Sequence, residues 1–414
     1  MVNDLLSAAE PLFYLIYIVV ILITGILVSL IAKKIKIPNI LFLLLGGIFL
    51  GHLEYHGEPL ISFPAVFLTA ISTVALVMIV FDAGSKFNIR EFDTLAWRVI
   101  KLSSIFFLLT LVFLSLATKF MFEVSIWHAL IFSSLMAGTS PSVILTMFGN
   151  IKTKVLEILK IESIINTPLT VLFPFMILEL SYKLTDVTLS KFDIILEQFE
   201  PFIVLFIAGV GTGVLMGLIG SRIMKNNYLR NISPLALITM ALLTYVLSEK
   251  LGGNGVLAVT IMGLFYGNLY IKEKVKLFEF SEIFTNSMEI LVFVLIGLVV
   301  KFPLTRAFIY KSLALFSIYL IIRFVSINIS FKKDGLKIRE KLFMTLNVQK
   351  GIAVAVVVFF LSTIPALTTI MHLTLAFMLY SIILSTLFLP FTKKMLNLNI
   401  EKEETVKKRE IDDV

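Results

Sequence analysis

Long apolar runs recur along almost the whole chain. We count thirteen of about 17 to 25 residues, the length that a helix needs to cross a lipid bilayer. Hydrophobic residues make up 58% of the 414 and charged residues only 15%, too little polar surface for a water-soluble protein of this size. The sequence therefore predicts an all-α polytopic membrane protein with thirteen transmembrane helices. They cover roughly 11–32, 38–54, 64–83, 97–118, 125–148, 155–181, 199–221, 233–249, 253–270, 284–301, 307–330, 342–363 and 372–392.

Lysine and arginine are concentrated in every second loop between these runs. About 27 of the 36 lie in the loops after the odd-numbered runs or in the C-terminal tail. By the positive-inside rule these loops are cytoplasmic, which predicts a cell-membrane protein with its N-terminus outside and its C-terminus inside. Residues 1–396 then form the transmembrane domain and residues 397–414 a charged cytoplasmic tail. Since the basic residues follow one membrane face, we expect no nucleic-acid partner.

Several kinds of chemistry lack the residues they would need. The chain has no cysteine, and its four histidines are scattered without ligand spacing. No set of nucleophile and base stands out from the sequence. We therefore expect no enzyme activity, no cofactor and no metal other than a transported ion.

An internal repeat links the two halves of the chain. The segment "LLLGGIFLGHL" of the second run resembles "VTIMGLFYGNL" of the ninth, so that Gly47 and Gly51 match Gly263 and Gly267. At almost the same offset, "VFDAG" in the third run matches "VLIG" in the tenth. Seven helices separate the copies, so they cross the membrane in opposite directions. Inverted repeats of this kind are typical of secondary transporters.

Two runs at corresponding positions of the repeat are interrupted. The fifth contains "GTSP" at 138–141, where proline lacks an N–H and clashes with the preceding helical turn. The twelfth contains "NVQKG" at 347–351. Irregular backbone at membrane depth is tolerated only where it is buried in protein or lines a wet cavity. We therefore expect helices 5 and 12 to be discontinuous and to cross at the transport site.

Five charged residues lie within the runs, where charge is costly and points to function. Glu162 and Arg323, both in cytoplasmic halves, are expected to form a structural ion pair. Asp82 is followed by small residues and is either an ion ligand or an interfacial charge. Glu289 is expected at the interface, because it lies near the start of its run. Lys350 either neutralises carbonyl ends at the helix crossing or takes part in transport.

The sixth run carries the polar stretch "ESIINT". Glu162, Ser163, Asn166 and Thr167 lie within a turn of one another on a helix and form one patch. Pro168 frees a main-chain carbonyl in the preceding turn. The patch is either a polar contact between helices or an oxygen-rich site for a hard cation such as Na⁺.

The motifs "KIPNILFLLLGGIFLG", "FDAG", "GTSP" and "ESIINT", with the glycine pattern of the ninth run, resemble the monovalent cation/proton antiporter superfamily, most closely its archaeal and bacterial Na⁺/H⁺ branch. The resemblance spans nearly the whole chain. It implies a core bundle at about 97–181 and 307–392, a dimerisation part at about 11–83 and 199–301, and a homodimer. It implies the ion pair of Glu162 with Arg323, and an ion-binding site formed by Asp82, Thr139, Ser140, Ser163, Asn166 and Thr167.

Two positions depart from the family pattern. Ser140 and Thr167 stand where the family usually has aspartates, and a hydroxyl group cannot exchange a proton near neutral pH. Three functions stay open. The chain exchanges Na⁺ or K⁺ for H⁺, with Asp82, with or without Glu162, in the protonatable role. It moves an ion or small solute without proton exchange, such as an anion attracted by Arg323 and Lys350. Or it is an inactive relative.

Overall fold

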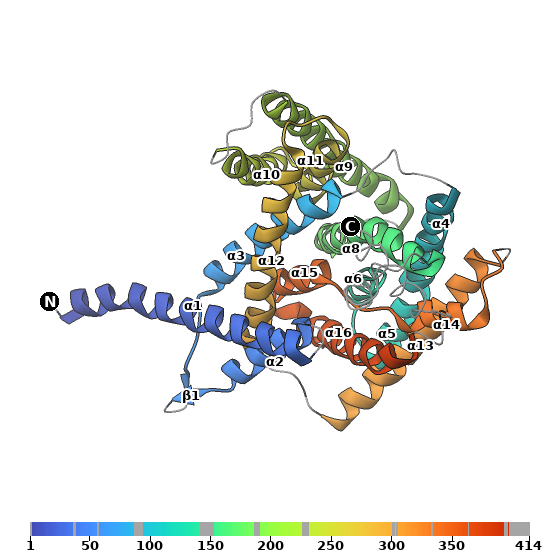
Figure 1. The fold of residues 1–414 in the computed structure, drawn as a ribbon, viewed down its shortest axis with the longest axis horizontal. Coiled ribbons are helices and arrows are strands. Elements are labelled where there is room, and N and C mark those ends of the chain that lie inside the picture. Colours follow the sequence, from blue (N-terminus) through green and yellow to red (C-terminus); the bar gives the residue numbers. More distant parts are fainter. Residues whose placement is uncertain are drawn as a thin grey trace, which may run out of the picture.

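The computed structural model describes residues 2–35, 39–55, 58–86, 94–140, 153–185, 191–225, 232–299, 303, 305–332, 334–362, 364–392 and 396. Nearly all of this part is α-helical (Figure 1). Eight of its helical segments are long and apolar enough to cross a membrane, and the helices Asn39–Gly51, Ile126–Met136 and Gly255–Asn268 are shorter apolar ones. The prediction of an all-α membrane protein is therefore confirmed.

The first half of the chain begins with a long helix and a tiny hairpin. Its helices are α1 (Val2–Ile35), α2 (Asn39–Gly51), α3 (Ala65–Ser85), α4 (Thr94–Leu109), α5 (Ser115–Phe122), α6 (Ile126–Met136) and α8 (Lys154–Thr185). A π-helical turn at Thr110–Leu114 joins α4 to α5 without a break. Strands β1 (Glu54–Tyr55) and β2 (Glu58–Pro59) pair antiparallel between α2 and α3.

The second half is again mostly helical in its described residues. It contains α9 (Lys191–Met224), α10 (Ser233–Lys250), α11 (Gly255–Asn268), α12 (Lys274–Val299), α13 (Arg306–Ser330), α14 (Ile338–Leu346), α15 (Ile352–Leu361) and α16 (Thr368–Phe388). Short 3₁₀ turns at Pro365–Leu367 and Leu389–Phe391 flank α16.

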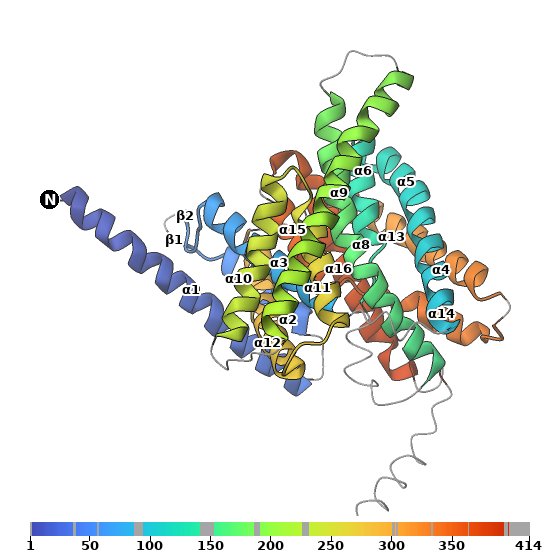
Figure 2. The ribbon, with the colours of Figure 1, turned by 90° about the horizontal axis from the view of Figure 1, so that it is seen from above.

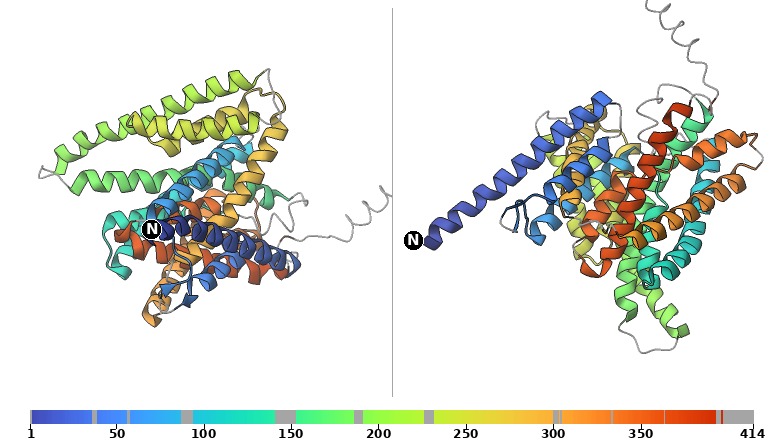
Figure 3. Two further views of the ribbon diagram at one scale, coloured as in Figure 1. Left: turned by 90° about the vertical axis from the view of Figure 1, so that its left-hand side faces the viewer. Right: turned by 90° about the horizontal axis from the view of Figure 1, so that it is seen from below.

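The helices pack in two groups that meet along α3, α12 and α15. Helices α1–α3 pack with α9–α12, while α4–α6 and α8 pack with α13, α14 and α16 (Figures 1 and 2). Helix α1 extends away from the rest, with the N-terminus at its far end (Figure 3). Large apolar side chains remain exposed along α1, as expected of a surface that faces lipid.

Glycines hold α2 tightly against α12. A Cβ atom built on Gly47 or Gly51 would lie closer than 3.0 Å to the main-chain oxygen of Val294 or Leu298, respectively. Main-chain atoms cannot give way as a flexible side chain could. The two helices can approach this closely only because both positions lack a side chain.

The matching glycines of the second copy make the matching contacts. A Cβ atom on Gly263 or Gly267 of α11 would meet the main-chain oxygen of Phe81 or Ser85 of α3 at a similarly short distance. In the repeat alignment, Phe81 and Ser85 of α3 correspond to Val294 and Leu298 of α12. Each copy's glycine-rich helix thus packs on the other copy's partner helix, so the repeat seen in the sequence is also a repeat in space.

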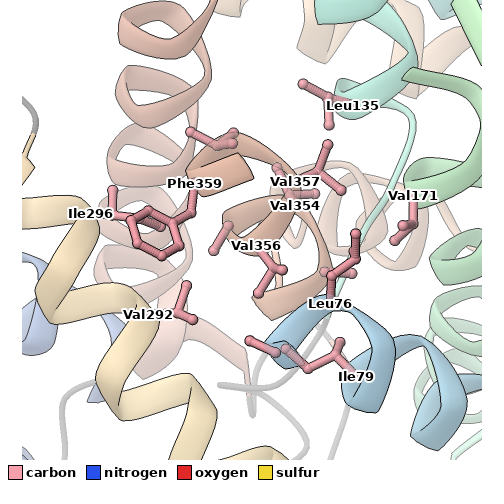
Figure 4. Packing of buried hydrophobic residues seen from close by; sticks show 14 of the residues in the cluster. Leu76, Ile79, Leu135, Val171, Val292, Ile296, Val354, Val356, Val357 and Phe359 are labelled. Carbon is pink, nitrogen blue, oxygen red and sulfur yellow. The ribbon is translucent and has the colours of Figure 1, made fainter. Parts of the chain in front are cut away.

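The junction between the two groups is filled by apolar side chains. Val292 and Ile296 of α12 lie beside Phe359 of α15, and Leu76 and Ile79 of α3 lie on the other side of α15 (Figure 4). All five are buried. This apolar seam places α15 between α3 and α12 on one side and the second group of helices on the other.

Helix α12 begins earlier than its apolar run. The run was expected at 284–301, but the helix starts at Lys274. Residues 274–283 contain several charges, yet Leu277 and Ser281 are buried, so an amphipathic stretch of nearly three turns precedes the apolar part. The helix thus extends beyond the predicted span at its start, and the expected position of Glu289 at the interface stays a prediction. Glu289 lies fifteen residues after the start and ten before the end of α12.

Candidate ion-binding site

The fifth predicted span loses its helical form at "GTSP". Helix α6 ends at Met136, Ala137 is its C-cap, and Gly138, Thr139 and Ser140 are not helical. A Cβ atom on Gly138 would overlap the side chain of Thr170 on α8, so this position admits only glycine at the present spacing. The remainder of this predicted span, 141–148, lies outside the described residues.

The twelfth predicted span is interrupted as well. Helix α14 ends at Leu346, and α15 begins at Ile352. The five residues between them, Asn347 to Gly351, are not helical, and all but Gly351 are almost completely buried. The predicted break at "NVQKG" is therefore observed over its whole length, and that at "GTSP" as far as Ser140.

The two non-helical segments contact each other. The main-chain N–H of Ser140 donates to the main-chain oxygen of Gln349 at 2.7 Å. A Cβ atom on Gly351 would come within 2.7 Å of the Cβ atom of Ser140, so the glycine allows this approach. Main-chain groups that leave a helix at membrane depth need new partners, and here each break supplies some of them to the other.

Lys350 holds the end of α6 from the second break. Its Nζ donates to the main-chain oxygens of Met136 and Gly138, each at 2.6 Å, and to the hydroxyl of Tyr319 at 2.6 Å. The ammonium group is completely buried and also lies 4.5 Å from the centre of the Tyr319 ring. A positive charge at the C-terminal end of a helix is favourable, because free carbonyls concentrate partial negative charge there.

Asn166 of α8 approaches the first break from the other side. Its Nδ2 lies 3.5 Å from the main-chain oxygen of Ala137, 3.5 Å from Oγ1 of Thr139 and 3.4 Å from Oε1 of Glu162. The main-chain oxygen and the carboxylate oxygen can only accept, so the amide nitrogen is the atom that must face this cluster. Backbone and side-chain oxygens of this type are ligands for hard monovalent cations.

Glu162 and Arg323 form the buried ion pair next to this cluster. Arg323 donates from both terminal nitrogens to both carboxylate oxygens, and the Nη2–Oε2 distance is 2.6 Å. Both side chains are fully buried, and the guanidinium group lies 4.7 Å from the centre of the Phe106 ring. A bidentate pair stacked on an aromatic ring is well suited to keep two charges inside a membrane protein.

The other predicted site residues, Ser163, Thr167 and Asp82, make no contact with this network in the bonds that the structure shows. Thr167 and Ser163 are one turn apart on α8, and the Thr167 hydroxyl donates to the Ser163 main-chain oxygen at 2.7 Å. Asp82 lies near the end of α3, and its carboxylate pairs with Nζ of Lys86 at 2.8 Å. The structure thus joins Thr139, Asn166 and Glu162 through side chains and Ser140 through its main chain, while Asp82 is engaged with its own helix end.

The sequence reasoning missed the aromatic and main-chain partners of the buried cations. Tyr319 and Phe106 contact Lys350 and Arg323, respectively. Tyr319 precedes Arg323 by one helical turn, so their common face on α13 could have been read from the spacing. The carbonyls of Met136 and Gly138 carried no such signal, because every residue has a carbonyl group.

Comparisons with known proteins identify the family. The family model described as the transmembrane sodium/hydrogen exchanger matches residues 18–395. The chain belongs to the sodium/hydrogen exchanger family. That family consists of transporters, and the superfamily expected from the sequence is confirmed.

Individual relatives within the family are distant. The Na(+)/H(+) antiporter 1 of Methanocaldococcus jannaschii is 26% identical over 360 residues, which cover 82% of this chain and 81% of that protein. The K(+)/H(+) antiporter NhaP2 of Shewanella baltica is 24% identical over 283 residues, or 66% of this chain. The matched part is 47% of that protein, so the match spans about half of its length.

A solved structure shares the fold. The sodium proton antiporter MjNhaP1 from Methanocaldococcus jannaschii, determined at pH 8, superposes with a TM-score of 0.74 at 20% sequence identity. The superposition covers 94% of this chain and 98% of that one. The overall arrangement of helices is therefore that of an antiporter of this family.

Proposed function

We propose that this chain exchanges a monovalent cation, Na⁺ or K⁺, for protons across the cell membrane. Its family supports the class of transport, and relatives named as Na⁺/H⁺ and K⁺/H⁺ antiporters support the ions. The observation that carries the proposal is the contact between two interrupted helices inside a buried polar cluster. Such a contact at membrane depth is the usual position of the site in transporters built from inverted repeats.

The proposed architecture follows the predicted topology. Thirteen spans place the N-terminus outside and the C-terminus in the cytoplasm, with helices 5 and 12 crossing at the contact of Ser140 with Gln349. The core bundle comprises about 97–181 and 307–392. Residues 11–83 and 199–301 form the dimerisation part of a homodimer. Alternating access is then a movement of one group of helices against the other along the seam at α3, α12 and α15.

The proposed cation ligands are oxygen atoms around the first break. Thr139, Ser163 and Thr167 supply side-chain oxygens, and Ser140 adds a hydroxyl in place of a carboxylate. Asn166 contributes Oδ1 after its amide group rotates, since Nδ2 faces the cluster in the structure. Main-chain oxygens freed at the end of α6, such as that of Ala137, complete the set. The Glu162–Arg323 pair lies against Asn166 and fixes its orientation.

Asp82 is the proposed carrier of the exchanged proton. Glu162 is committed to Arg323, whereas the partner of Asp82, Lys86, is half exposed to solvent and can be hydrated when the pair opens. Asp82 is also a proposed cation ligand, so a proton and a cation compete for its carboxylate, which is the simplest physical basis of exchange. The hydroxyls of Ser140 and Thr167 cannot provide this competition.

Proton movement in proteoliposomes tests the proposal. We expect an imposed Na⁺ or K⁺ gradient to change the internal pH with the parent protein and not with Asp82→Asn. Asp334→Asn is a matched control, since Asp334 is equally buried and also pairs with a half-exposed basic residue, Arg98. A parent protein without cation-driven proton movement, or an Asp82→Asn variant as active as the control, contradicts the assignment.

A second candidate function is transport of an anion or solute without proton exchange. The balance of buried charge favours it: among the described residues around the two breaks, Arg323 and Lys350 are positive and only Glu162 is negative. Uptake of a labelled anion such as ³⁶Cl⁻ or of a cation such as ²²Na⁺ into the same proteoliposomes separates the two functions. Saturable anion uptake without a pH change would favour the second one.

A further inference from the structure

Glu289 is a carboxylate near the middle of α12, a helix that is long and apolar enough to cross a membrane. At 1.5 Å per residue it lies about 22 Å from the start of α12 and about 15 Å from its end. It is only partly buried, yet it makes no hydrogen bond or ion pair that the structure shows with any described residue. A charged group at this depth is costly and is a candidate for function.

The face of α12 that carries Glu289 is polar toward the start of the helix. Glu282, Thr285 and Glu289 are spaced by three and four residues and therefore share one face. The next residues of that face are the apolar Val292 and Ile296, which pack beside Phe359 of α15 (Figure 4). The polar part of the face thus ends where the apolar seam between the two groups of helices begins.

Thr285 adds an oxygen atom without a partner to this face. Its side chain is 6% exposed, and Oγ1 has no hydrogen-bond partner within the described part of the chain. Buried threonine hydroxyls on helices commonly bond to the carbonyl one turn earlier, as Thr244 does in α10. Thr285 lies one turn before Glu289, so the hydroxyl and the carboxylate can serve the same ligand.

The charged groups opposite this face belong to the end of α3. Nζ of Lys86 lies 2.8 Å from the Asp82 carboxylate and 3.9 Å from the carboxylate of Glu282. Helices α2 and α15, which also pack on α12, have no titratable residue. On α10 the titratable residues are Tyr245, Glu249 and Lys250, and on α1 they are Asp4, Glu10, Tyr14, Tyr17, Lys33 and Lys34.

These groups form a graded path into the membrane. Lys86 and Glu282 are about half exposed, Asp82 and Thr285 are buried, and Glu289 lies two turns deeper than Glu282. We will call Glu282, Thr285, Glu289 and Asp82 the α3–α12 path. It leads from the end of the helices to the apolar seam beside α15.

We propose that Glu289, with the Thr285 hydroxyl, is a second binding site at which a monovalent cation and a proton compete. When a cation binds, the protonated carboxyl group of Glu289 releases its proton toward the exposed end of the α3–α12 path. One positive charge replaces another, so the site stays neutral in both forms. The inference rests on the proposed exchange and adds to it a carboxylate deeper than Asp82.

Proton release from the purified protein in detergent tests this site without transport. In a weakly buffered solution with a pH indicator, NaCl or KCl should release protons from the parent, and choline chloride should not. Glu289→Gln should release about one proton fewer per chain. Glu279→Gln removes an exposed carboxylate of α12 that lies outside the α3–α12 path and should behave as the parent does, and Glu289→Asp should restore the release.

Two results would overturn the inference: no cation-dependent release from the parent, or equal release from Glu289→Gln and the parent. If Glu289→Gln does not fold, Thr285→Val provides the test, with several-fold more cation expected for half-maximal release. An unchanged cation concentration for half-maximal release then counts against the site.

Transport assays separate this second site from the proposed exchange. Release without exchange in proteoliposomes refutes only the exchange, and exchange that survives in Glu289→Gln with an unaltered cation dependence refutes only the site.

Discussion

The main-chain N–H of Ser140 and the main-chain oxygen of Gln349 are 2.7 Å apart, although 209 residues separate them in the chain. The bond joins the two points at which membrane helices are interrupted. An unpaired main-chain group inside the membrane is costly, so each break is tolerable because the other lies beside it. The contact of the breaks therefore belongs to the stability of the fold as much as to the proposed ion site.

Lys350→Met should destabilise this contact. The substitution keeps an unbranched apolar chain but leaves the oxygens of Met136, Gly138 and Tyr319 without their shared donor. Each buried polar group without a partner costs about 1–3 kcal/mol. We expect a clear decrease in the melting temperature in detergent, measured by the fluorescence of a thiol-independent dye or by light scattering.

Lys341→Met serves as the control for this substitution. The Lys341 amine bonds to Oδ1 of Asn328 at 3.0 Å at a partly exposed position, so its loss can be compensated by water. We expect less than about 1 kcal/mol for it. A melting temperature of Lys350→Met equal to that of Lys341→Met would show that Lys350 does not hold the end of α6.

Arg323→Ala should lower the thermal stability more than Asp82→Ala. Removal of the guanidinium group leaves the Glu162 carboxylate buried and uncompensated, which costs on the order of 3–5 kcal/mol. Asp82→Ala releases Lys86, which is half exposed and remains hydrated. The double variant with Arg323→Ala and Glu162→Gln should recover part of the loss, because it also removes the orphaned charge. Equal melting temperatures for Arg323→Ala and the parent would remove the structural role of the pair.

Gly47→Ala should separate α2 from α12. The new methyl group would overlap main-chain atoms of Val294 and Gly297, so the helices must move apart along their whole contact. We expect about 1–3 kcal/mol of destabilisation, as for other overpacked positions. Gly211→Ala in α9 is the matched control, since nothing lies within 4 Å of a Cβ atom there. Its replacement should be neutral or stabilising, because alanine favours a helix over glycine. Similar melting temperatures for both variants would contradict the close packing.

The sequence predicted the features that follow from patterns along the chain. The matching glycines indicated the inverted repeat, and they make matching contacts in space. Proline and glycine within apolar runs marked both breaks, and the shared depth of Glu162 and Arg323 indicated a pair. Each of these three features depends on a residue type whose property the position requires: the missing side chain of glycine, the missing N–H of proline, or a charge that needs an opposite charge.

Contacts between main-chain atoms and the true ends of helices could not be predicted in this way. The main-chain oxygens that accept hydrogen bonds from Lys350 carry no sequence signal. The sequence therefore could not decide whether Lys350 neutralises carbonyl ends at the helix crossing or takes part in transport. The charged first turns of α12 lowered the local hydropathy, which hid the true start of the helix. The spacing of Asp82 and Lys86, four residues apart on α3, did contain the signal for their pair.

Thr167→Asp addresses the missing aspartates directly. Thr167 follows Asn166 on α8 and is partly buried, and its hydroxyl is engaged only with the main chain of its own helix in the contacts that the structure shows. An aspartate there would place a protonatable group next to Asn166, whose side chain contacts Thr139 and Glu162. We expect faster cation-driven proton movement than in the parent, or an altered pH dependence, measured as the internal pH of proteoliposomes after addition of Na⁺, Li⁺ or K⁺.

Thr167→Asn is the control for this variant: it has the same shape as the aspartate without the charge and should not change the rate of proton movement. If the parent moves no protons between about pH 5 and 9, the range in which carboxylates with moderate shifts and histidines titrate, and Thr167→Asp does, the exchange proposal is wrong for this chain. The fold would then be that of an antiporter whose ion chemistry has been removed at Ser140 and Thr167.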